Sequence, residues 1–117
     1  MTAMTIHIAC LCAAWCRTCE AYDEVFRAAC AELPQQDLRV HWIDIEDQAD
    51  LIGDLDIETF PTLLIADDRQ VRFAGPLTPQ PETLRRMLRA QVEGDGHPAP
   101  GLDPAYRELA QRLRDAP

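Results

Sequence analysis

The apolar residues along the chain follow two different spacings, and each spacing predicts a different kind of element. Residues 5–11 form a short apolar run with β-branched side chains, which is typical of a strand buried on both faces. Residues 17–33 instead carry apolar side chains three and four positions apart, which predicts an amphipathic helix that Pro34 ends. The same criteria predict further strands over residues 38–45, 61–66 and 70–74, and helices over residues 49–55, 82–92 and 105–116.

The order of these elements predicts how the strands pair. A strand, a helix and a second strand in succession make two parallel neighbouring strands, so residues 5–11 and 38–45 should lie side by side. The short polar connection at residues 67–69 predicts a hairpin that Gly75 and Pro76 end. Residues 94–104, rich in glycine and proline, read as a linker. We therefore expect one domain over residues 1–93, with residues 94–117 a linker plus a C-terminal helix packed on that domain.

Charge and composition narrow the possible partners. The net charge of −9 over 117 residues argues against nucleic acid or an anionic membrane, because both are bound by neutralising phosphates. All 11 basic residues are arginine, which excludes lysine-based covalent chemistry. No apolar stretch approaches a membrane span of roughly 18 residues, and no basic segment precedes the apolar start. We expect a monomer located in the cytoplasm.

The cysteines carry the most specific chemical signal. Four of the five lie within ten residues, at Cys10, Cys12, Cys16 and Cys19, and Cys30 follows. In a chain without a signal peptide, such clustering indicates metal binding or redox chemistry. Cys16 and Cys19 open a helix directly after a buried strand, where unpaired backbone N–H groups and the helix dipole favour a thiolate.

This position predicts different roles for the two cysteines. Arg17 adds a positive charge beside Cys16, which favours Cys16 as the attacking thiolate. Cys19 is one turn further and points inward, where it can resolve a mixed disulfide. The alternative is that both are ordinary small core residues.

Two motifs resemble the thioredoxin family. Residues 13–19, Ala-Ala-Trp-Cys-Arg-Thr-Cys, resemble the active-site segment of that family, and residues 59–65, Thr-Phe-Pro-Thr-Leu-Leu-Ile, resemble its cis-proline strand. The resemblance covers about residues 5–92. It implies an α/β thioredoxin-like fold, with a central four-stranded mixed sheet in the order second, first, third, fourth strand, flanked by helices. The helix over residues 105–116 would be an addition.

The resemblance also implies an activity and a set of site residues. It implies thiol–disulfide exchange with protein substrates, without a cofactor or metal, through the catalytic residues Cys16 and Cys19. Protein thiols or disulfides and an unidentified reductase or oxidant would be the partners. A cis Pro61 would pack against the cysteines and free the Phe60 backbone to pair with an extended substrate, although a trans Pro61 that starts a strand is the alternative. Trp15 and Arg17 complete the implied substrate-binding set.

The chain departs from the family in three ways. Thioredoxins carry a strand and a helix before the strand that leads to the active site, and here only four residues precede Thr5. We hypothesise that residues 94–117 cover part of the exposed edge of the strand at residues 38–45. Cys10 stands where thioredoxins have a buried aspartate, and Trp42 where they have its lysine partner. Proton transfer from Cys19 would then need water or a carboxylate such as Asp44 or Glu46.

The third departure is the dipeptide between the two cysteines, which is Arg-Thr instead of Gly-Pro. Arg17 should favour the reduced thiolate, while the acidic residues 44–58 oppose it if they border the site. Such a rim would repel the carboxylates of glutathione and suits a basic protein or peptide substrate. The alternative is a merely solvated acidic face.

Other uses of the cysteines remain open. The four clustered thiols could hold zinc or an iron–sulfur cluster, but a central strand would keep Cys10 well away from the helix start. Only Cys12 approaches Cys16, and it could have a second redox role. Cys10 and Cys30 are predicted to be inert core thiols, and His7, His41 and His97 show no metal-ligand spacing. A thioredoxin-like binding module with structural or metal-binding cysteines is therefore the alternative function.

Overall fold

The computed structural model describes residues 5–13, 16–33, 37–53, 55, 57, 61–78, 80–92, 98–99 and 101–115. Four strands form one mixed sheet: β1 (Ile6–Cys12), β2 (Leu38–Asp44), β3 (Thr62–Ala66) and β4 (Val71–Pro76). The helices are α1 (Arg17–Ala31), α2 (Ala49–Ile52), α3 (Pro81–Val92) and α4 (Pro104–Asp115). In the described part of the chain, no helix is long and apolar enough to cross a membrane.

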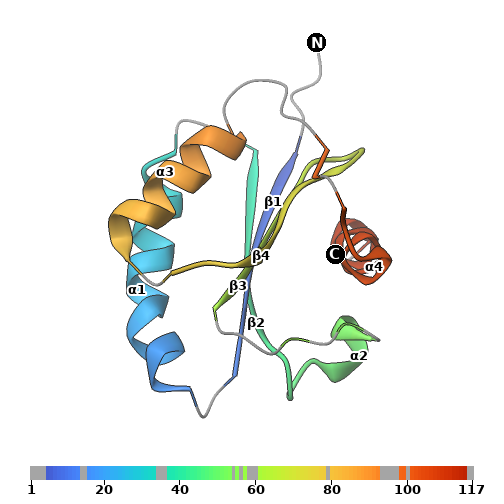
Figure 1. The fold of residues 1–117 in the computed structure, drawn as a ribbon, viewed down its shortest axis with the longest axis horizontal. Coiled ribbons are helices and arrows are strands. Elements are labelled where there is room, and N and C mark those ends of the chain that lie inside the picture. The colour runs from blue at the N-terminus through green and yellow to red at the C-terminus, as the bar shows by residue number, and fades with distance from the viewer. Residues whose placement is uncertain are drawn as a thin grey trace.

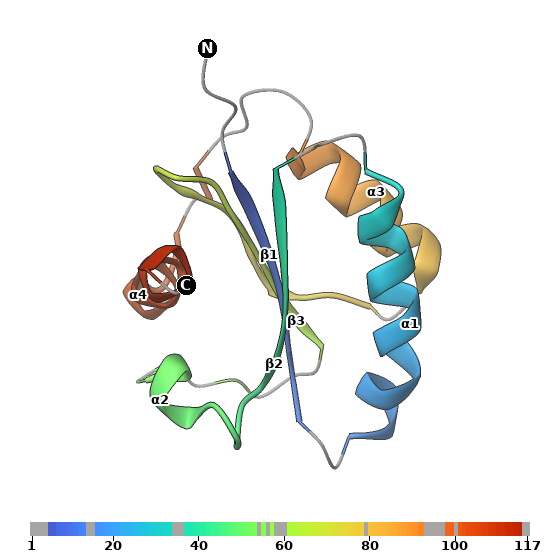
Figure 2. The same ribbon diagram turned by 180° about the vertical axis from the view of Figure 1, so that it is seen from behind.

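The strand order is β2-β1-β3-β4, as predicted. β1 pairs with β2 in parallel, while β3 is antiparallel to both β1 and β4. Figures 1 and 2 show α1 and α3 on one side of the sheet and α2 and α4 on the other. The α/β thioredoxin-like architecture expected from the sequence is therefore confirmed.

β1 is one of the two inner strands of the sheet, and its alternating side chains divide the core in two. Ile6, Ile8, Cys10 and Cys12 pack in a cluster with residues of α1 and α3. Ala9 and Leu11 pack in a second cluster, which includes Leu109 and other residues of α4. This division follows from the period of two in a strand, where successive side chains point to opposite faces.

Several element boundaries differ from the expected ones for identifiable reasons. β4 continues through Gly75 and Pro76, and Pro76 lies opposite Thr62. A proline is tolerated there because β4 is an edge strand of the sheet. α2 is shorter than predicted because it ends before Gly53, whose φ of 63° lies in the left-handed region that glycine favours.

The hypothesis that the C-terminal segment covers the edge of β2 is wrong for its described part. α4 contacts β4, β1, β3 and α2, so it lies over a face of the sheet (Figure 1). The Ala99 N–H donates to the Val71 carbonyl at 2.8 Å, which places the preceding segment beside β4, at the opposite edge from β2. The apolar stripe of α4 explains this position, because Leu109 and Leu113 are buried in the second cluster.

Candidate functional site

Cys16 stands at the junction between β1 and α1. Its backbone is extended, with φ −88° and ψ 114°, and it is the N-cap residue of α1. The Cys16 carbonyl accepts the first helical hydrogen bond from the Glu20 N–H at 3.1 Å, and its own N–H donates to the Ala13 carbonyl at 3.0 Å. The Cys16 thiol makes no capping hydrogen bond and is half-buried, and Arg17 beside it is exposed. The predicted nucleophile therefore lies at a helix N-terminus, as the sequence predicts.

A disulfide joins Cys12 and Cys19, and Cys16 is a free thiol. The sequence predicts exchange between Cys16 and Cys19, so this pairing was not expected. β1 extends to Cys12, one residue beyond the predicted strand, and the strand alternation turns that side chain toward α1. Cys19 faces inward from the first turn of α1, and the two Cα atoms are 5.8 Å apart, a usual separation for a disulfide.

The other two thiols lie deeper in the core. The Cys10 sulfur is 3.8 Å from the Cys12 sulfur, and burial raises the pKa of the Cys10 thiol, with Cys30 and Asp23 adding to the effect. Burial also raises the pKa of the Cys30 thiol to about 12. Among the described residues, the buried Tyr22 hydroxyl has no hydrogen-bond partner, and burial raises its pKa too. These groups are therefore neutral at physiological pH.

Three acidic residues line a cavity together with the two bonded cysteines. A cavity of about 250 Å³ is lined by Cys12, Ala13, Cys19, Glu20, Asp23, Trp42 and Asp44. Asp44 is the register partner of Cys12 on β2, and its Oδ1 accepts the N–H groups of Glu46 and Asp47 at 2.9 and 3.3 Å. The structure thus brings the predicted Asp44 to the site, whereas Glu46 does not line this cavity.

The sequence reasoning did not single out Glu20 and Asp23 for this cavity. Their positions do contain a signal: they follow Cys19 by one and four residues on the same helix. Residues four apart lie on one face of a helix, so Asp23 was placed to share the surroundings of Cys19. The signal was missed because Asp23 also pairs with Arg27 on the helix surface, with 2.6 Å between Arg27 Nε and Asp23 Oδ1.

Pro61 lies at the same end of the sheet as the cysteines. Thr62 is the register partner of Leu11, and the strands are antiparallel, so Pro61 comes next to Cys12. Pro61 is buried, and its carbonyl accepts the Leu77 N–H at 3.2 Å. Trp15 and Phe60 lie outside the described residues, and so does the peptide bond that joins Phe60 to Pro61.

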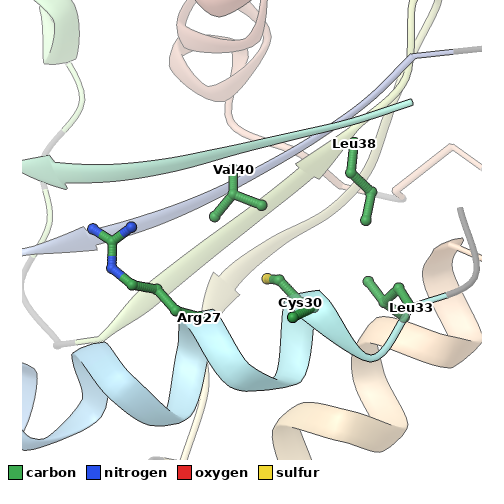
Figure 3. A pocket seen from close by; sticks show the side chains of 6 residues that line it. Arg27, Cys30, Leu33, Leu38 and Val40 are labelled. Carbon is green, nitrogen blue, oxygen red and sulfur yellow. The ribbon is translucent and has the colours of Figure 1, made fainter. Parts of the chain in front are cut away.

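A second cavity lies away from the start of α1. It measures about 380 Å³ and lies between the C-terminal half of α1 and β2, where Figure 3 shows Val40 and Leu38 opposite Cys30 and Leu33. Among the described residues its lining is mainly apolar, and Arg27 is the charged one. The described lining contains none of the acidic residues that line the cavity at the disulfide.

The described residues contain no group of three or more histidine, cysteine or acidic side chains arranged to hold a metal ion. Cys12 and Cys19 are bonded to each other, which leaves neither sulfur as a thiolate ligand. His7 and His41 stack across β1 and β2 with ring centroids 5.4 Å apart, but they form only a pair.

Comparison with known proteins gives the same fold. The family model described as Thioredoxin matches residues 2–89. The germline-specific thioredoxin Deadhead of Drosophila melanogaster superposes with a TM-score of 0.63 at 14% identity, covering 74% of this chain and 80% of that one. Thioredoxin O2 of Arabidopsis thaliana in its oxidised state gives 0.61 at 19% identity, covering 74% of each chain.

A third structure, mitochondrial thioredoxin 3 of Saccharomyces cerevisiae in its oxidised form, gives a TM-score of 0.59 at 18% identity. It covers 73% of this chain and 77% of that one. No curated protein matches the sequence. At these identities the structural likeness establishes the fold alone.

Proposed function

Because the chain belongs to the thioredoxin family, we propose that it exchanges disulfides with protein substrates, with Cys16 as the nucleophile and Cys19 as the resolving thiol. The observation that carries this proposal is the contrast in exposure among the cysteines. Cys16 is half-buried and free at a helix start, whereas Cys10, Cys12, Cys19 and Cys30 are all buried. A protein substrate can therefore reach Cys16 before any other thiol.

The proposed reaction has two displacements. In the reduced protein, the Cys16 thiolate attacks a substrate disulfide, forms a mixed disulfide and releases one substrate thiolate. Cys19, three residues further along the first turn of α1, then attacks the Cys16 sulfur and releases the second substrate thiolate. The substrate gains two electrons, and the protein holds a Cys16–Cys19 disulfide. The reverse sequence oxidises a substrate dithiol, so either direction uses the same residues.

Charge near the site favours a basic substrate. Glu20, Asp23 and Asp44 line the cavity beside the disulfide, and Arg17 is the positive group next to Cys16. Carboxylates of this kind attract a cationic peptide and repel the two carboxylates of glutathione. We therefore propose a protein or peptide with basic character as substrate, and a protein reductase or oxidant in the cytoplasm as the second partner. Trp15, Arg17, Phe60 and Pro61 are the proposed substrate-binding residues.

The test is insulin reduction by dithiothreitol, with Cys16→Ser and Cys30→Ala compared with the wild type. Cys30 is the matched control because it is a buried free thiol that does not line the disulfide cavity. Wild type and Cys30→Ala should accelerate the reaction, and Cys16→Ser should give only the dithiothreitol background. An inactive wild-type protein, or an active Cys16→Ser variant, would contradict the proposal.

A further inference from the structure

Cys19 has two possible disulfide partners within its reach. It is bonded to Cys12, and both residues are 2% exposed. Cys16, three residues before Cys19, packs against the same cluster of buried side chains. Residues three apart at a helix start lie on one face, so the same Cys19 side chain can also form a disulfide with Cys16. The exchange reaction proposed above ends with the second pairing, whereas the structure holds the first.

We propose that Cys12 is a third redox-active thiol. After substrate exchange, Cys12 replaces Cys16 as the disulfide partner of Cys19, and the protein then holds a buried Cys12–Cys19 disulfide. This inference rests on the proposed function, since it begins from the Cys16–Cys19 disulfide left by the substrate. It assigns Cys12 a chemical role in place of a purely structural one.

The transfer step conserves electrons within the protein. The Cys12 thiolate attacks the Cys19 sulfur of the Cys16–Cys19 disulfide, the Cys12–Cys19 bond forms, and Cys16 leaves as a thiolate. No external oxidant or reductant is consumed. Cys16 leaves at the N-terminus of α1, where the helix dipole interacts favourably with the negative charge that develops on its sulfur. The Cys12 proton passes to a carboxylate or to water.

The cavity beside the disulfide supplies that proton acceptor. Asp44, Glu20 and Asp23 line it together with both bonded cysteines. Asp44 is held in place because its Oδ1 accepts two backbone N–H groups from the following turn. β1 itself supplies no carboxylate next to Cys12, because the neighbouring side chain on the same face of the strand is the Cys10 thiol. Deprotonation of Cys12 therefore depends on the carboxylates that β2 and α1 supply.

We call this transfer of the disulfide from Cys16–Cys19 to Cys12–Cys19 the relay, and it ends at Cys12. Cys10 has its sulfur 3.8 Å from that of Cys12 and is the next thiol inward. It is fully buried, and burial raises the pKa of its thiol, so its thiolate is scarce. An attack by Cys10 on Cys12 is disfavoured for that reason. The oxidised protein consequently keeps a buried disulfide and a free Cys16 that a substrate can reach.

The test follows the disulfide during one turnover. Reduced protein is mixed with an equimolar peptide disulfide, acid-quenched at successive times and alkylated with N-ethylmaleimide. Chymotryptic cleavage after Trp15 and Tyr22 then separates Cys12 from the fragment that contains both Cys16 and Cys19. A Cys16–Cys19 disulfide gives a loop within this fragment, and a Cys12–Cys19 disulfide gives two cross-linked fragments.

We expect the looped fragment to form first and then to be replaced by the cross-linked pair, with N-ethylmaleimide on Cys16. In Cys12→Ser the loop should persist and the labelling of Cys16 should be lost, while Cys30→Ala should behave as wild type. A loop that persists to equilibrium in the wild-type protein overturns the relay, and this readout needs no variant to fold. Failure of the exchange proposal looks different: Cys16→Ser would then still reduce the peptide.

Discussion

The two faces of the sheet are built from the same strands but differ in chemistry. The cluster under α1 and α3 contains four buried cysteines, and Cys16 packs against it. The cluster under α2 and α4 contains none and consists mainly of aliphatic side chains. Alternation along β1 makes this separation, since Cys10 and Cys12 point to one face and Ala9 and Leu11 to the other. Substitutions in the aliphatic cluster should therefore leave the redox chemistry of the cysteines unchanged.

The hairpin between β3 and β4 fastens both faces together at the end opposite the cysteines. Arg72 Nε donates to Asp67 Oδ2 at 2.9 Å, and both side chains are buried. Arg72 Nη1 also donates to the carbonyls of Gln91 and Val92 at the end of α3. Arg114 of α4 donates to the Asp67 carbonyl at 2.8 Å. A side-chain change at Asp67 should therefore weaken the connection to α3 through Arg72 without touching the thiols, while the Arg114 bond to the main-chain carbonyl stays in place.

The largest effect on stability is expected from Asp67→Asn, which removes the carboxylate charge that pairs with the buried Arg72 guanidinium. Removing one partner of a buried pair costs about 3–5 kcal/mol of unfolding free energy. Urea denaturation measures this loss, and alkylation of Cys16 in the native protein should stay unchanged. A loss as small as that of an exposed ion pair such as Arg27–Asp23 would show that Asp67 does not carry this role.

The same carboxylate sets an acid limit to stability. Burial alone would raise the pKa of Asp67, but hydrogen bonds from the Arg69 and Gln70 N–H groups and from Arg72 outweigh it and hold the pKa below its usual value. A group with a lowered folded pKa stabilises above its unfolded pKa, near 4, and that stability is lost as the pH falls through the folded pKa. The acid limb of the wild-type stability profile should therefore be steeper than that of Asp67→Asn.

A smaller loss is expected from Leu109→Ala on the aliphatic face. Leu109 is fully buried in α4, and deletion of a buried leucine side chain costs about 2–5 kcal/mol. Thermal or urea unfolding should show this loss, while the insulin-reduction rate of the folded variant should match the wild type. A reduced rate under fully native conditions would contradict the separation of the two faces.

A modest change in rate is expected from Asp44→Asn on the cysteine face. The amide keeps the shape and can still accept the backbone hydrogen bonds, but it cannot take a proton from Cys12 or Cys19. A general base contributes roughly 10²–10⁴-fold, and Glu20 and Asp23 share this cavity, so we expect less than that range. Single-turnover rates against pH measure the effect, with Asp47→Asn as a surface control. Identical pH profiles for all three proteins would exclude Asp44.

The smallest effect is expected from the stacked pair of His7 and His41. Burial lowers the pKa of both imidazoles, and the positive charge of a protonated His7 lowers the pKa of His41 further. The unfolded chain then binds protons near pH 6.5 that the folded chain does not, so stability falls as the pH drops below that value. His41→Phe should lose less stability than the wild type between pH 7.5 and 5.5 in urea titrations. An equal loss would assign the pH dependence to other groups.

Much of the architecture was predictable because it depends on local patterns. The strand-helix-strand start and the hairpin follow from hydrophobic spacing and turn residues, and together with the motif at Cys16 they led to the correct strand order. The position of Cys16 at a helix start follows from the change of period that begins at Arg17. These features can be predicted without knowing which faces of distant helices and strands pack together.

The features that were missed depend on packing between distant elements. The Cys12–Cys19 disulfide requires that a strand end and a helix turn face each other, which spacing alone does not show. Whether α4 packs against the edge of β2 or over a face of the sheet depends on which aliphatic surface the other elements leave uncovered. The roles of Trp15 and Phe60 stay predictions, as do the catalytic roles of Cys16 and Cys19.

The central claim is that substrates react at Cys16, and a trapped intermediate tests it most directly. In a variant with Cys12→Ser and Cys19→Ser, neither the resolving thiol Cys19 nor its later partner Cys12 remains, so a peptide disulfide should leave a stable mixed disulfide on Cys16. Mass spectrometry of the fragment after Trp15 cleavage locates the adduct. The account predicts one peptide per molecule on Cys16. An adduct on Cys10 or Cys30, or no adduct while the wild type is active, would contradict it.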